Sequence, residues 1–140
     1  MDSVLGFHSD DLGKLIVRVT VGGLMLFHGL SKLLHGIGWM PPMLQMHGLP
    51  GVLAYGVFVA EIVAPLFILA GWKTRLLSLA IVFDMVMAIW LEFRDRIFTV
   101  KPAGGGWMIE LEVFFLLCSA ALFFLGSGKF SVSRGRGKWD

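Results

Sequence analysis

Four long apolar stretches, separated by shorter turn-forming segments, constrain the fold of this chain more than any other feature. A helix that crosses a bilayer needs about 20 mostly apolar residues, and stretches of roughly this length cover residues 12–34, 52–71, 76–93 and 107–125. The chain is 56% hydrophobic and only 16% charged, whereas globular domains are about 45–50% apolar and about 25% charged. The sequence therefore predicts an all-α fold, an integral membrane four-helix bundle.

The segments outside the spans predict a simple organisation. Residues 1–11 lack the basic start of a secretory signal and are expected to form a polar N-terminal leader. Residues 12–127 are expected to form the four-span domain, and residues 128–140 a basic, poorly ordered C-terminal tail rich in glycine and arginine. A net charge of only +2 gives no reason to expect a nucleic-acid partner, so the expected partner is the lipid bilayer.

The distribution of basic residues predicts that both termini face the cytoplasm. With four spans, the two end segments and the turn at 72–75 share one side of the membrane. Cytoplasmic segments carry an excess of lysine and arginine. The side with the termini carries Lys14, Lys73, Arg75, Lys129, Arg134, Arg136 and Lys138, and the other side carries Lys32, Arg94, Arg96 and Lys101.

Ionisable residues inside the predicted spans are the candidate functional residues, because lipid makes each of them costly. In the first span, Arg18 and Lys32 are a multiple of seven residues apart and share a helical face with Gly22 and Gly29. His28 lies one turn before Lys32. Since small residues let helices approach closely in lipid, this face is expected to contact protein.

Arg18 is expected to form a structural ion pair within the membrane. At about 1.5 Å per helical residue, Arg18 lies about 9 Å from the inner boundary, Asp84 about 12 Å and Glu61 about 16 Å. A guanidinium is a natural partner of a buried carboxylate, so the expected pair is Arg18 with Glu61 or with Asp84. For the charged residues of the spans as a group, the alternative to a functional polar pocket is a purely structural ion-pair network that fixes helix register.

A polar pocket is expected in the outer half of the bundle. His28 and Lys32 would form its cationic wall, and carboxylates of the second and fourth spans would face them. In the fourth span Glu112 shares a face with Ser119 and is expected to point inward, with Glu110 near the headgroups. A quinone suits such a pocket, because its carbonyl oxygens need a few hydrogen-bonding groups in an apolar cleft.

The sequence assigns no catalytic residue and no metal site. The four histidines lack diagnostic metal spacing, and only His28 lies well inside a span, whereas a bis-histidine haem needs two such ligands. Cys118 is the single cysteine, which excludes an internal dithiol pair. No intrinsic cofactor is therefore expected, and quinone is the candidate ligand.

Several of these residues resemble the DoxX family of small four-helix membrane proteins. The likeness rests on Arg18 with GGLMLFHGLSKL at 22–33, on Glu61 with PLFILAGWKTRLLSL at 65–79, and on WMIELE and FFLGSGKFSV around the last span. The resemblance implies a protein of the prokaryotic inner membrane, whose relatives include the DoxD subunit of a thiosulfate:quinone oxidoreductase. It carries over the polar positions Arg18, His28, Lys32, Glu61 and Glu112.

These observations predict a membrane-anchor or quinone-interacting subunit of a redox or respiratory complex, not catalytic alone. Protein partners in that complex would supply the electrons, because the chain carries no cofactor motif. Two alternatives stay open. One is a non-enzymatic accessory or assembly subunit of a larger membrane complex. The other is a small transporter subunit, in which buried charges mark a path.

Overall fold

The computed structural model describes residues 9–140, and the regular elements of this part of the chain are helices. Most of the expected leader, residues 1–8, lies outside the described part. The helical elements are α1 (Ser9–His35), α2 (Met40–Met46), η1 (Gly51–Tyr55), α3 (Gly56–Phe58), η2 (Val59–Val63), α4 (Ala64–Ala70), α5 (Thr74–Ala88), η3 (Ile89–Phe93), η4 (Arg94–Arg96) and α6 (Glu110–Leu125). Elements η1 to α4 run on without a break as one long helix, and α5 to η4 as another.

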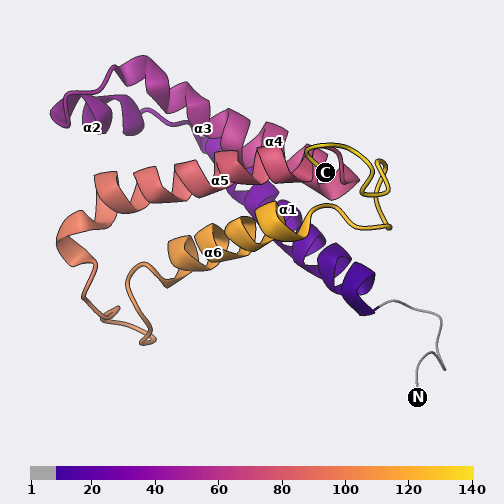
Figure 1. The fold of residues 1–140 in the computed structure, drawn as a ribbon. Coiled ribbons are helices and arrows are strands. Elements are labelled where there is room, and N and C mark those ends of the chain that lie inside the picture. The colour runs from indigo at the N-terminus through magenta and orange to yellow at the C-terminus, as the bar shows by residue number, and fades with distance from the viewer. Residues whose placement is uncertain (1–8) are drawn as a thin grey trace.

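The long helices pack side by side around one apolar core (Figure 1). Helix α1 contacts α4, α4 contacts α5, α5 contacts α6, and α6 returns to α1. The core between them consists of fully buried side chains from all four: Val21, Met25, Ile68, Ile81, Phe115 and Leu122. Large apolar side chains also cover the outside, among them Phe27, Leu34, Phe83 and Phe124, as a helical membrane bundle requires.

Three of the helices are long and apolar enough to cross a membrane: residues 10–35, 51–70 and 74–96. The expected fourth span is shorter than the sequence indicated, because α6 begins at Glu110. Trp107 instead pairs with Val100 in an isolated bridge of the preceding turn. The 16 residues of α6 rise about 24 Å, less than the roughly 30 Å of a bilayer core. A fourth crossing therefore remains a prediction.

The segment after α1 is more ordered than a plain loop. It contains α2, whose first turn holds Pro41 and Pro42, positions where a missing N–H breaks no helical hydrogen bond. Leu44 of this helix packs with Ile37, Ala54 and other side chains in a second, smaller apolar cluster. The α2 segment therefore covers the end of the bundle where α1 ends and η1 begins (Figure 1).

Two glycines fix how closely α1 approaches its neighbour. A Cβ on Gly22 would lie 2.8 Å from Leu69 Cγ, and a Cβ on Gly29 would lie 2.3 Å from the carbonyl oxygen of Glu61. Only helices with small residues at the contact approach so closely. The prediction that the Gly22 and Gly29 face contacts protein is confirmed.

The C-terminal segment packs on the bundle, which corrects the expectation of a poorly ordered tail. The Ser133 hydroxyl donates to the Gly71 carbonyl at 2.9 Å, and the Val132 N–H donates to Ala70 at 3.0 Å. Arg75 Nε donates to the main-chain carbonyl of Asp140 at 2.8 Å. The last carbonyl groups of an α-helix have no hydrogen-bond partner within the helix. The C-terminal segment supplies donors for two such carbonyls at the end of α4, those of Ala70 and Gly71.

Arg18 is held by this same segment, not by a carboxylate, so the expected pair of Arg18 with Glu61 or Asp84 is wrong. Its guanidinium donates to the main-chain carbonyls of Ser127 and Phe130, and the residue is only 2% exposed. Gly71 makes room, since a Cβ there would lie 2.7 Å from Arg18 Nη1. Arg18 therefore lies level with the end of α4, while Glu61 lies level with Gly29, about 16 Å further along α1.

Replacing Arg18 should release the C-terminal segment. Arg18→Met removes two charge-assisted hydrogen bonds and leaves two carbonyls unpaired, which costs about 3 kcal/mol and raises the detached population roughly a hundredfold. We expect trypsin to cleave detergent-solubilised Arg18→Met much faster after Lys129 and Arg134, as followed by mass spectrometry. Arg94→Met, at an exposed site, is the matched control, and equal cleavage rates in both variants would contradict this role.

Candidate functional site

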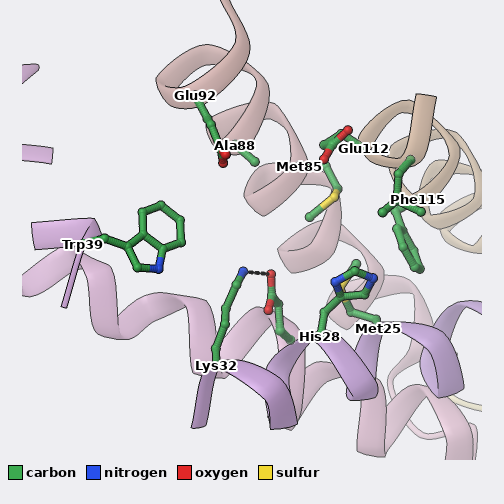
Figure 2. A pocket seen from close by; sticks show the side chains of 11 residues that line it. Met25, His28, Lys32, Trp39, Met85, Ala88, Glu92, Glu112 and Phe115 are labelled. Atoms are coloured by element: carbon green, nitrogen blue, oxygen red, sulfur yellow. Dashed lines mark hydrogen bonds and ion pairs between the residues drawn. The ribbon is translucent and has the colours of Figure 1, made fainter. Parts of the chain in front are cut away.

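A cavity of about 160 Å³ lies between α1, the 51–70 helix, the 74–96 helix and α6. Figure 2 shows Lys32 and His28 rising into it from α1, with Glu92 and Glu112 approaching from the other helices. Glu61 is the fifth polar residue of the lining, and the other lining residues are apolar or aromatic: Met25, Trp39, Met85, Ala88, Leu111 and Phe115. Ligand pockets are usually about 300–1,000 Å³, so this cavity suits a group of about one ring.

Lys32 and Glu61 form the ion pair of the cavity. Lys32 Nζ lies 2.5 Å from Glu61 Oε1, and the dashed line in Figure 2 marks this contact. The Glu61 side chain is only 3% exposed and that of Lys32 is 26% exposed. The second carboxylate oxygen of Glu61 is buried without a hydrogen-bond partner. A buried acceptor oxygen without a donor is costly, and the side chain of Asp84 lies next to this carboxylate.

Two π-helical turns carry cavity-lining carboxylates. Glu61 lies in η2 and Glu92 lies in η3, the two π turns of the described chain. A π turn adds one residue to a helical turn and is frequent at functional sites. After η2, Pro65 has no N–H to offer the Glu61 carbonyl, and that carbonyl instead lies against Gly29. The local distortion therefore directs the Glu61 side chain toward Lys32 while its backbone contacts α1.

Carboxylates outnumber cations around the cavity. Glu61, Glu92 and Glu112 line it, against one ammonium from Lys32. One oxygen of Glu112 is also buried without a partner. The charged groups near Glu92 are Glu112, Lys32 and Arg96. Carboxylates therefore continue from the cavity toward the exposed end of the 74–96 helix. Such a site can accept, hold and release protons.

Aromatic rings flank these charges. The His28 ring meets Phe115 edge to face, with 5.6 Å between the ring centroids. Trp39 closes the side nearest α2, and Figure 2 shows its indole pointing toward Lys32. Aromatic side chains next to hydrogen-bonding groups are typical of sites that hold flat ring systems.

The structure brings the three sequence-predicted pocket residues, His28, Lys32 and Glu112, around one cavity. Glu61, the carboxylate of the second span, also lines it as expected, but its partner is Lys32 and not Arg18. Asp84, expected to pair with Arg18 as well, instead lies near the charges of Glu61 and Lys32. Glu110 is exposed and pairs at 3.6 Å with Lys101, whereas Ser119 is buried.

Sequence reasoning missed Glu92 and Trp39. Glu92 stands close to the end of a predicted span, where a carboxylate can reach the headgroups, and Trp39 lies between two predicted spans. Both belong to the cavity because the 74–96 helix stays helical past Phe93 and because α2 folds back over the bundle end. A carboxylate inside the last turn of a span was the one available signal for Glu92.

Within residues 9–140, no group of three or more histidine, cysteine, aspartate or glutamate side chains is placed to hold a metal ion. Comparison with known families identifies one relationship: the family model described as DoxX matches residues 13–94. This range covers α1, α2, the 51–70 helix and most of the 74–96 helix, and it includes His28, Lys32, Glu61 and Glu92. No curated protein and no solved structure matches the chain significantly.

Proposed function

The chain belongs to the DoxX family of membrane proteins, and on this premise we propose that it is the quinone-interacting or anchoring membrane subunit of a redox complex. The observation that carries the proposal is the ring-sized cavity in which an ammonium–carboxylate pair and unpartnered carboxylate oxygens lie among aromatic and apolar side chains. Protein partners supply the electrons. The protein sits in the inner membrane of a prokaryote, with its basic end toward the cytoplasm.

Different cavity residues contact the quinone ring and transfer its protons. Lys32 is a donor for one carbonyl oxygen, and its pairing with Glu61 fixes the position of its ammonium. His28, placed against Phe115, offers a second donor. A bound quinone takes up two protons when it is reduced. Glu112 and Glu92 are placed to carry them, because they lead from the cavity to the exposed end of the bundle.

The first test identifies the partners. Purification from native membranes in mild detergent, followed by mass spectrometry, should recover dehydrogenase, cytochrome or other redox subunits with the chain. A protein that comes out alone, or only with itself, would contradict membership of a redox complex.

A conservative change at Glu112 then tests the site. Glu112→Gln keeps the shape of the side chain but cannot carry a proton, so quinone reduction by the purified complex should fall about a hundredfold with its subunit composition unchanged. Glu110→Gln is the matched control, because Glu110 has the same chemistry two residues away and does not line the cavity. Full turnover in Glu112→Gln would overturn the site assignment.

A transporter subunit is the second candidate, and the excess of carboxylates in the cavity favours it. One ammonium against three carboxylates suits a cation or a proton better than a neutral ring. In that case the chain alone should carry cation or proton flux in proteoliposomes, and Glu112→Gln should abolish the flux. An accessory or assembly subunit would form its complex normally and show neither effect.

A further inference from the structure

A second hollow lies at the opposite end of the bundle from the Lys32–Glu61 cavity. This groove, of about 720 Å³, runs between the first half of α1, the start of α5 and the end of α6. Lys14 lines it, and 18 residues of α1 separate Lys14 from Lys32, which corresponds to about 27 Å along the helix. The groove is therefore separate from the proposed quinone cavity and shares none of its residues.

The lining of the groove combines charged and apolar side chains. Val17, Phe124 and Leu125 supply apolar surface, and Phe124 is 74% exposed. Lys14 and Arg75 supply positive charge, opposed by the carboxylate of Asp10. Because the first candidate span begins at residue 10, we expect the charged groups at headgroup level and the apolar side chains toward the hydrocarbon.

The cationic groups in the groove keep unused hydrogen-bond donors. Arg75 uses Nε for the Asp140 carbonyl and Nη1 for the Phe123 carbonyl at 3.0 Å, which fixes its guanidinium and leaves Nη2 without a partner in the described chain. Lys14 forms no ion pair with another described residue. The C-terminal segment packed nearby adds four more basic residues, Lys129, Arg134, Arg136 and Lys138. The net charge at this end of the bundle is positive.

We propose that this groove binds a phospholipid with an anionic head group. Lys14 and Arg75 contact the phosphate, and an acyl chain lies along Val17, Phe124 and Leu125. Basic pockets between membrane helices select anionic lipids because each lysine or arginine near the surface adds about 1 kcal/mol. The two carbonyl contacts hold the Arg75 guanidinium in place, so that its Nη2 can donate to a phosphate oxygen, while the apolar floor requires a lipid and not a free phosphate.

Native mass spectrometry of the purified protein, titrated with phosphatidylglycerol or with phosphatidylcholine, tests the proposal. Phosphatidylglycerol should bind more tightly than phosphatidylcholine, and inorganic phosphate at the same concentration should not compete. Lys14→Gln should weaken phosphatidylglycerol binding about fivefold, and Lys14→Arg should retain it. Lys138→Gln is the matched control, because it makes the same charge change at the same end of the bundle but does not line the groove.

Three results would overturn the proposal. Equal binding of the two phospholipids would remove the role of the phosphate contacts. Equal weakening in Lys14→Gln and Lys138→Gln would show a general surface attraction without a site. Competition by inorganic phosphate would show an anion site that does not need the apolar groove. A comparison of helical circular dichroism among the variants ensures that altered binding is not a consequence of misfolding.

Discussion

Gly29→Ala is expected to destabilise the bundle by about 3 kcal/mol, although alanine is the better helix former. The new Cβ would lie 2.3 Å from the Glu61 carbonyl oxygen and 2.6 Å from Ile62 Cγ1. The first of these atoms is backbone, so no side chain can rotate away, and α1 must move from its neighbour. That movement also separates Lys32, one turn further on, from Glu61. The free energy of unfolding can be measured by titration with sodium dodecyl sulfate in mild detergent.

Gly23→Ala is the control for this prediction. It makes the same chemical change six residues earlier on the same helix, where a Cβ meets no atom within 4 Å. Gly23→Ala should leave stability unchanged or raise it by up to about 1 kcal/mol, the usual helix preference for alanine over glycine. If both variants were equally stable, the close contact between Gly29 and Glu61 would not contribute to holding the bundle together.

Glu61→Leu is expected to cost about 3 kcal/mol, because it leaves the Lys32 ammonium without its partner beside an apolar cavity. The Lys32 side chain is 26% exposed. The expected loss of stability is therefore at the lower end of the range measured when one partner of a buried ion pair is removed. The double variant Lys32→Met/Glu61→Leu replaces both charges with apolar groups, and its stability should return to within about 1 kcal/mol of the unmodified protein. The same titration measures both.

The double variant also separates structure from function. It should fold and join its complex but fail to support quinone reduction, because the donor and the carboxylate that fix the ring are gone. If the single variant were as stable as the unmodified protein, the ion pair would not be a structural element. If the double variant were as unstable as the single one, packing around Glu61 and not the charge pair would explain the loss.

The helical membrane fold could be predicted because its signals are local. Apolar runs of bilayer length predict the three long helices to within about three residues of the observed bounds. The close contact at Gly22 and Gly29 follows from small residues on one helical face. Glu112 and Ser119 point inward together because they lie seven residues apart on α6.

The partners of the buried charges could not be predicted, because they depend on how far one helix slides past another. Depth counted from predicted span ends placed Arg18 within reach of Glu61. In the structure, α1 and the 51–70 helix align so that Gly29 meets Glu61 and Arg18 meets Gly71. The groups that bind Arg18 are main-chain carbonyls of a distant segment. Every residue has a main-chain carbonyl, so the residue types do not show which ones bind Arg18. The π turns at Glu61 and Glu92 could not be predicted either, because they do not interrupt the apolar pattern of their helices.

The contact between Arg18 and the C-terminal segment has a consequence for how the protein is made. Arg18 and Ser127 are 109 residues apart, which at about 5–20 residues per second of translation corresponds to a delay of roughly 5–20 s. During that delay the ribosome has delivered every other long helix, while the Arg18 side chain still extends to the membrane surface for hydration. The contact therefore forms late in folding: Arg18 leaves water only after residues 127–130 have been synthesised, and its withdrawal closes that end of the bundle.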